Sequence, residues 1–199
     1  FTVSPLFKKD KKIATHIAIV EDISARKESE EIIKKSEIRF KSLFEDSPIP
    51  LWEEDFSEIK KHLEKLNLIN ENPQTLALYF KTHPDLVDKC FSLLKIIDVN
   101  TMCLKLHKVK TKKELILDHS QIIDENYISA FTKQLIAITP GEKQIIVDTK
   151  IKTSEGEYRD VNLRWSVIRG YEKTLERIIL STADITDRKS SESIILKSK

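Results

Sequence analysis

The sequence has little glycine and little cysteine, and each shortage excludes a class of protein. Its three glycines, Gly141, Gly156 and Gly170, lie far apart, whereas phosphate-binding loops need clustered glycines so that the backbone can approach the ligand. Its two cysteines, Cys90 and Cys103, make no disulfide framework and no Cys-x-x-Cys or Cys/His ligand spacing. We therefore expect neither a nucleotide-using enzyme nor a metal site, and we expect a reducing compartment.

Long apolar runs and an excess of charge of one sign are also missing. No segment approaches the roughly 18 apolar residues that span a bilayer, and the start, "FTVSPLFKKDKK", lacks the pattern of a signal peptide. Lys and Arg number 34 against 32 Asp and Glu, so the net charge gives no reason to expect nucleic acid as a partner. We expect a cytoplasmic chain cut from a longer parent, which could itself be membrane-attached.

What the sequence does contain is one segment that occurs twice. Residues 22–37 match residues 184–199 without a gap, at an offset of 162, with 10 of 16 positions identical. Upstream of both copies the pattern is apolar-rich strand, polar turn and strand. We therefore expect four parts: the last two strands of a preceding unit (1–24), a linker helix (25–46), one complete unit (47–186) and the start of the following linker helix (187–199).

The complete unit is expected to mix strands and helices. Two short strands, at 50–54 and 94–100, are separated by about 40 residues with three predicted helices. A longer helix at 124–138 precedes three long strands. In the second of these, at 157–169, apolar and polar residues alternate, which indicates an antiparallel sheet with one buried face.

This order of elements resembles that of a PAS sensor domain. "SEIRFKSLFEDSPIPLWEEDFS" is similar to a PAS entry segment, "IIDVN" to the second strand, and "GEYRDVNLRWSVI" to the strand that follows a glycine. "STADITDRK" and "AIVEDISARK" both resemble the Asp-Ile-Thr exit motif. The resemblance implies an α+β fold with a five-stranded antiparallel sheet, helices on one face and flanking linker helices. The helical insertion between the first two strands departs from the usual short turn.

The resemblance also implies a function. PAS units are signalling modules, so we expect a sensing or relay domain of a multi-domain protein, such as a sensor histidine kinase, without catalytic residues of its own. The implied partners are neighbouring PAS and output domains, a small-molecule ligand, and a second copy bound through the linker helices. A dimerisation or protein-interaction module without a ligand is the alternative.

The first candidate site is the passage from the last strand into the exit helix. Asp and Thr side chains suit this position because they can satisfy the free N–H groups of a helix start. The resemblance implies that the passage couples movement of the sheet to the output helix. Its residues are Asp184, Thr186 and Arg188, with Asp22, Ser24 and Arg26 as the equivalents in the preceding unit.

The second candidate site is a cavity between the inner face of the sheet and the 124–138 helix. A filled core without a ligand remains the alternative. The candidate lining residues are Trp52, His119, Tyr127, Phe131, Arg164 and Trp165.

The cofactor, if there is one, is unknown. PAS photoreceptors that bind flavin carry a reactive cysteine in a Gly-x-Asn-Cys-Arg run, whereas Cys103 lies in "TMCLKL". Haem needs an axial ligand, most simply a histidine on or near the long helix, and His119 only precedes that helix. We therefore expect neither flavin nor haem.

Overall fold

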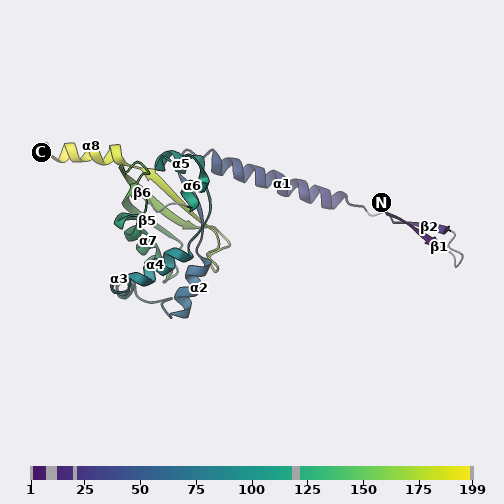
Figure 1. The fold of residues 1–199 in the computed structure, drawn as a ribbon, viewed down its shortest axis with the longest axis horizontal. Coiled ribbons are helices and arrows are strands. Elements are labelled where there is room, and N and C mark those ends of the chain that lie inside the picture. Colours follow the sequence, from purple (N-terminus) through teal and green to yellow (C-terminus); the bar gives the residue numbers. More distant parts are fainter. Residues whose placement is uncertain (1, 8–12, 20–21, 118–121, 198–199) are drawn as a thin grey trace. The chain divides into compact units, whose positions relative to one another are not determined.

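The computed structural model describes residues 2–7, 13–19, 22–117 and 122–197 (Figure 1). The chain divides into two compact units, Phe1–Leu43 and Phe44–Lys199. Each unit is described by itself below.

The first unit is a hairpin followed by a long helix. Strands β1 (Thr2–Phe7) and β2 (Ile13–Ile19) pair antiparallel. Helix α1 (Ser24–Glu45) follows and continues into the second unit. Ion pairs at i,i+4 spacing support α1: Arg26 with Glu30 at 2.9 Å and Lys35 with Glu31 at 3.8 Å.

The second unit is built on a five-stranded sheet, as expected. Its strands are β3 (Leu51–Asp55), β4 (Lys95–Val99), β5 (Gln144–Lys152), β6 (Tyr158–Val167) and β7 (Ile178–Asp184). Their order is β4-β3-β7-β6-β5, and every neighbouring pair is antiparallel. Gly156, in the turn between β5 and β6, has a φ of +84°, a conformation that favours glycine.

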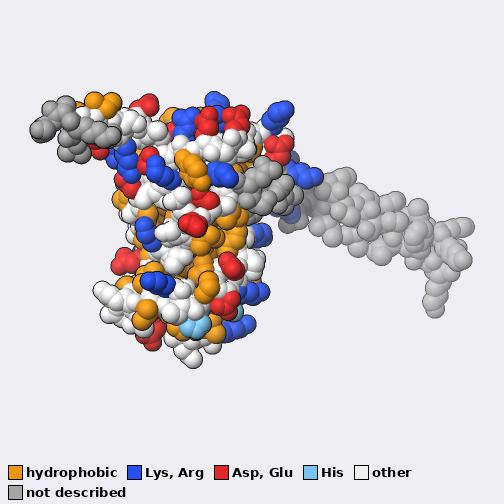
Figure 2. All heavy atoms as spheres, turned by 60° about the vertical axis from the view of Figure 1, so that its left-hand side comes forward, with side chains coloured by type: hydrophobic (Ala, Val, Ile, Leu, Met, Phe, Trp, Pro, Cys, Tyr) orange, Lys and Arg blue, Asp and Glu red, His pale blue; other side chains and the backbone are white. Residues whose placement is uncertain are grey.

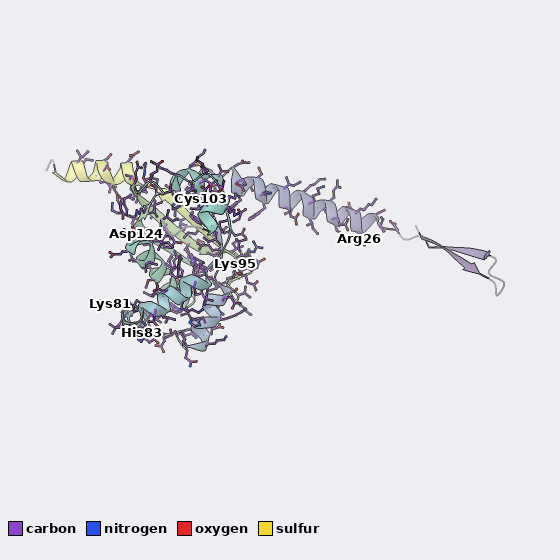
Figure 3. All side chains as sticks on the ribbon, in the orientation of Figure 1. Arg26, Lys81, His83, Lys95, Cys103 and Asp124 are labelled. Carbon is purple, nitrogen blue, oxygen red and sulfur yellow. The ribbon has the colours of Figure 1, made fainter. Side chains whose placement is uncertain are left out.

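Helices α2 to α7 pack on one face of this sheet. The expected insertion between β3 and β4 consists of α2 (Ser57–Lys65), α3 (Pro73–Thr82) and α4 (Pro84–Leu93). Helices α5 (Thr101–His107), α6 (Lys112–Leu117) and α7 (Glu125–Ile138) connect β4 to β5, and α8 (Thr186–Lys197) leaves after β7. Figure 3 marks Cys103 on α5 and Asp124 at the start of α7, where Asp124 accepts a hydrogen bond from the backbone N–H of Tyr127.

One hydrophobic cluster joins the inner face of the sheet to these helices. It includes Trp165 from β6, Leu76 from α3 and Leu135 from α7, all fully buried. Burying a large apolar side chain of this kind contributes roughly 1.5–3 kcal/mol. The insertion is therefore part of the core of the domain and not an appendage.

Asn100 ties the entry of the domain to its sheet. Its fully buried side chain accepts hydrogen bonds from the backbone N–H groups of Leu51 and Cys103 and donates to the carbonyl oxygens of Phe44 and Ile49, at 2.9–3.1 Å. The Asn100 amide thus provides a hydrogen-bond partner for four backbone groups, in the end of α1, the segment that leads into β3, and α5.

Replacing Asn100 with Ala should destabilise the protein by about 3 kcal/mol, because the buried backbone groups lose their partner. Urea unfolding measures this loss. The matched control is Asn72→Ala, which removes one exposed N-cap hydrogen bond to Gln74 N–H at 2.8 Å and should cost about 1 kcal/mol. If Asn100→Ala lowers the free energy of unfolding no more than Asn72→Ala does, Asn100 does not hold the entry of the domain to its sheet.

Candidate functional site

A small cavity lies between the inner face of the sheet and α7. Its volume is about 30 Å³, room for one or two water molecules. Side chains from β3, β5, β6 and β7 line it on the sheet side, and side chains from α5 and α7 line it on the helix side.

Three residues nominated from the sequence line this cavity. They are Trp52 from β3 and Tyr127 and Phe131 from α7. The ring of Phe131 packs edge-on against Phe91, with the ring centroids 5.4 Å apart. Aromatic rings therefore supply much of the apolar wall.

The other nominated residues do not line the cavity. Arg164 is exposed on the outer face of β6, because side chains alternate along a strand and its neighbours Leu163 and Trp165 point into the core. Trp165 is fully buried, but its ring packs against Phe56, beside α2, with centroids 5.7 Å apart. His119 lies outside the described residues. Arg164 and Trp165 therefore do not line this cavity.

Four buried polar residues of the cavity were missed: Glu54, His107, Gln134 and Thr182. Glu54 lies two residues after Trp52 on β3, so both face the same side. A polar residue at an inward strand position is an informative signal. For Glu54 that signal was hidden, because the run Glu53-Glu54-Asp55 does not reveal which carboxylate points inward.

Four buried side-chain atoms of the residues that line the cavity lack a hydrogen-bond partner among the described residues. They are Trp52 Nε1, Glu54 Oε2, His107 Nδ1 and Thr182 Oγ1. Buried polar groups are nearly always hydrogen-bonded, and each one left unsatisfied costs about 1–3 kcal/mol. Four such atoms among the lining residues make this part of the core unusually polar.

Glu54 is the acidic group of the cavity. Its side chain is 2% exposed, and burial raises its pKa to about 8. Burial of the Tyr127 hydroxyl, and to a smaller extent the nearby Glu54, raises the pKa of Tyr127. At neutral pH most Glu54 side chains are therefore protonated and uncharged.

His107 is the basic group of the cavity. Its ring meets the ring of Trp52 edge-on, with centroids 5.4 Å apart. Burial lowers its pKa to about 4, against the opposing effect of a hydrogen bond with the backbone of Lys152. The imidazole is therefore neutral at pH 7. Since Nδ1 has no partner, the bond to Lys152 uses Nε2.

The passage from β7 to α8 is tied to the neighbouring strand. Asp184 Oδ1 accepts a hydrogen bond from the backbone N–H of Thr186 at 2.9 Å. Thr186 Oγ1 accepts from the backbone N–H of Asp160 in β6 at 3.0 Å, and the N–H of Ile185 donates to the Asp160 carbonyl at 2.8 Å. The start of α8 is therefore held by β6 as well as capped.

Lys189 forms ion pairs between α8 and the sheet. Its Nζ lies 3.4 Å from Asp160 Oδ1 and 3.5 Å from Asp148 Oδ2. The pKa of Asp160 is lowered first by its hydrogen bond from Lys150 and further by Lys189. Arg188, the residue nominated from the sequence, pairs instead with Glu192 on its own helix at 3.7 Å.

The equivalent residues before α1 repeat the local part of this arrangement. Asp22 Oδ1 accepts from the backbone N–H of Ser24 at 2.9 Å, as Asp184 does from Thr186. Arg26 pairs with Glu30, as Arg188 does with Glu192. The pKa of the exposed Asp22 is lowered by its hydrogen bonds with Ser24.

The described residues do not fit a metal, a flavin or a haem. They contain no group of three or more His, Cys, Asp or Glu side chains that could hold a metal ion. Cys103 does not line the cavity; its Sγ donates to the Leu51 carbonyl at 3.0 Å, and burial raises its pKa to about 12. The cavity is also far smaller than the roughly 300–1,000 Å³ of sites for larger ligands.

Among the described residues, no helix has both the length and the apolar character that a membrane span requires.

No protein-family model matches the sequence, and no curated protein matches it. Among solved structures, the LOV protein of Rhodobacter sphaeroides is similar with a TM-score of 0.50 and 16% identity, over 81% of this chain and 73% of that one. The PAS domain of an HTR-like protein from Haloarcula marismortui gives 0.47 and 14%, over 80% and 99%. A domain of a sensory box sensor histidine kinase/response regulator from Geobacter sulfurreducens gives 0.44 and 15%, over 76% and 96%. The chain has the PAS fold, as its motifs indicated.

The Glu54→Gln variant should gain stability relative to the wild type as pH rises from 5 to 8. The unfolded chain ionises Glu54 near its ordinary pKa of 4.5, whereas the folded protein does so only near 8, so the wild type alone loses stability over this interval. The difference should reach on the order of 3 kcal/mol at pH 8 and be small at pH 5. Urea unfolding at both pH values tests this, and a difference that does not change with pH would contradict it.

Proposed function

We propose that this chain is a sensing and relay domain of a multi-domain signalling protein, such as a sensor histidine kinase. One observation carries the proposal: the cavity and the exit helix share β7. Thr182 borders the cavity, and Asp184, two residues later on the same strand, caps α8. A ligand that favours one position of β7 would therefore also favour one position of α8, as a shift in population between two states.

A second connection runs through β5 and β6. Lys150 borders the cavity, and its Nζ pairs with Asp160 at 2.9 Å. Asp160 in turn bonds to Thr186, Ile185 and Lys189 at the start of α8. Two chains of contacts thus connect the residues of the cavity with the exit helix. One runs along β7 from Thr182 to Asp184, and the other runs from Lys150 through Asp160 to Lys189.

The repeat supports a tandem arrangement. In the pairing of β1 with β2, Thr2 lies opposite Ile19 and Ser4 opposite Ile17. Adding the offset of 162 gives Arg164 opposite Ser181 and Ser166 opposite Ile179, which is the observed pairing of β6 with β7. We therefore propose that residues 1–24 are the last two strands of a preceding PAS unit, joined by a linker helix to the unit at 47–186.

The proposed setting is the cytoplasm, with neighbouring PAS and output domains as partners. Cys90 and Cys103 are free thiols, which suits a reducing compartment. Figure 2 shows acidic and basic side chains interspersed on the visible face of the domain, a pattern that does not favour nucleic acid. Regulation of the parent protein's output is the function that the domain would serve.

The relay predicts that Thr182 and Lys189 are energetically coupled. Thr182→Val changes the cavity without changing the shape of the side chain, and Lys189→Met removes the charge between α8 and the sheet. We expect the two changes to alter amide hydrogen exchange in α8 non-additively, by about 0.5 kcal/mol or more in a double-mutant cycle.

The matched control for this cycle is Arg188→Met, because the ion pair of Arg188 is with Glu192 on its own helix, whereas Lys189 pairs with Asp148 and Asp160 on the sheet. Thr182→Val and Arg188→Met should act additively on the exchange of α8. If Thr182→Val and Lys189→Met also act additively, the proposed route from the cavity to α8 through Lys189 is contradicted.

A second candidate function is dimerisation through α1 without a ligand. Ile33, Phe40 and Leu43 are exposed on α1. Their spacings of seven and three residues place them on one stripe of a heptad pattern. In α8, Ile195 stands at the position equivalent to Ile33 and is also exposed. Such a stripe is typical of the seam of a short two-stranded coiled coil.

This candidate predicts a dimer that Ile33→Glu weakens by about tenfold or more, since it would bring two carboxylates into the seam. Sedimentation velocity measures the change. Ile38→Glu is the control, because Ile38 is also exposed but lies off the stripe. Equal effects of both substitutions would exclude the seam, and native mass spectrometry would separate a bare dimer from a chain that retains a ligand.

A further inference from the structure

A second, wider hollow of the domain is an open groove that shares no lining residue with the small cavity. Its volume is about 460 Å³, within the roughly 300–1,000 Å³ of sites for small organic ligands. The groove is formed by the segment between α1 and β3, by α5, by the start of β6 and by the end of β7. Figure 1 shows α5 at the same end of the domain as the start of α8.

Most of the groove lining is apolar. Met102 and Leu106 are half-buried on α5 and lie four residues apart, so they share one face of the helix. Pro48 and Ile49 are exposed on the entry segment, and Ala183 contributes from β7. Apolar surface gathered in a groove of this size favours a ligand with an apolar part.

The charged side chains of the groove are mostly basic. They are Lys105, Lys108 and Arg159, against Asp184 alone. Lys108 Nζ has acidic partners outside the lining, at 2.6 and 2.9 Å, whereas the exposed Lys105 has no ion pair among the described residues. Lys105 follows Met102 by three residues, so both lie on the same face of α5. An ammonium group open to a ligand therefore lies beside apolar surface.

Arg159 adds hydrogen-bond donors on the β6 side of the groove. Its guanidinium group has five N–H donors, of which one on Nη2 is used for Glu157 at 3.1 Å. Nη1 lies 3.8 Å from Asp184 Oδ2, which is too far for a hydrogen bond. Arg159 therefore keeps donors that an acidic ligand can use, close to the residue that caps α8.

This combination selects among classes of ligand by charge and by apolar area. A cation would meet three basic side chains and gain nothing from Lys105. A neutral apolar molecule would cover the apolar lining but leave the ammonium group without a partner. A small inorganic anion would use the charge and leave the apolar lining in water.

We propose that the groove binds a small carboxylate with an apolar chain, such as a short fatty acid. The chain lies over Met102 and Leu106, and the carboxylate pairs with Lys105 on the rim, where it stays partly hydrated. This is a second site, separate from the small cavity, and the proposal does not rest on the sensing function.

Met102 provides a direct test, because it is the single methionine of the chain and lines the groove. In ¹³C–¹H spectra of the full chain labelled at the methionine methyl group, hexanoate should shift the one signal with saturation at pH 7. A Kd on the order of 1 mM is expected for a ligand of this size. Hexanamide and hexylammonium keep the chain without the negative charge, and at constant ionic strength they should bind about threefold more weakly or less. Acetate keeps the charge without the chain and should not saturate.

A lysine substitution tests the contact with the carboxylate. Lys105→Gln should raise the Kd for hexanoate about threefold, because it removes an exposed ion pair, and it should leave the Kd for hexanamide unchanged. Lys113→Gln is the matched control, since Lys113 is also an exposed lysine but lies on α6 and does not line the groove. It should change neither Kd.

Three results would overturn the inference. Equal Kd values for hexanoate and hexanamide, or equal effects of Lys105→Gln and Lys113→Gln, would show that the groove does not select a carboxylate through Lys105. Binding of acetate as tight as that of hexanoate would show that the apolar lining takes no part. No shift of the Met102 signal with hexanoate up to about 50 mM would show that the groove does not bind this class of ligand.

Discussion

The central position of β7 is the constraint on which the rest of the structure depends. β7 pairs with β3 on one side and with β6 on the other, so its inward side chains, Ile178, Leu180 and Thr182, belong to the core. The same strand ends in Asp184 and turns directly into α8. Side chains alternate along a strand, and β7 is paired on both sides, so Thr182 and Asp184 hold fixed positions two residues apart. The lining of the cavity and the cap of the exit helix therefore lie on one continuous strand.

The cavity makes the core less stable than an apolar core of the same shape would be. Glu54 and Thr182 occupy inward positions where Leu or Val would bury more apolar surface and leave no polar atom without a partner. Globular proteins are stable by only about 5–15 kcal/mol, so several unsatisfied atoms are a large cost. Costs of this kind are tolerated mainly where function requires them. Their concentration around one cavity of about 30 Å³ argues that its polarity has a use.

Much of the fold could be predicted from local chemistry, and less of the site could. Alternating side chains predict the long strands, and an N-cap residue before a proline, such as Asn72, predicts a helix start, because both signals depend on near neighbours. Arg164 was misplaced although the alternation of its own strand already put it outside. His107 could not have been found, since its burial depends on α5 packing against Trp52, 55 residues earlier in the sequence.

The repeat itself contains an argument for coupling. Most of its repeated contacts are local: Ser29 Oγ donates to the Ala25 carbonyl at 2.9 Å, and Ser191 Oγ donates to the Asp187 carbonyl at the same distance. Such contacts need nothing beyond the helix that contains them. Lys189 differs, because its acidic partners lie on β5 and β6, yet Lys27 stands at the equivalent position in the first copy. A capped helix alone would not require a lysine at this position, and the pairing with Asp148 and Asp160 gives Lys189 a role in holding α8 against the sheet.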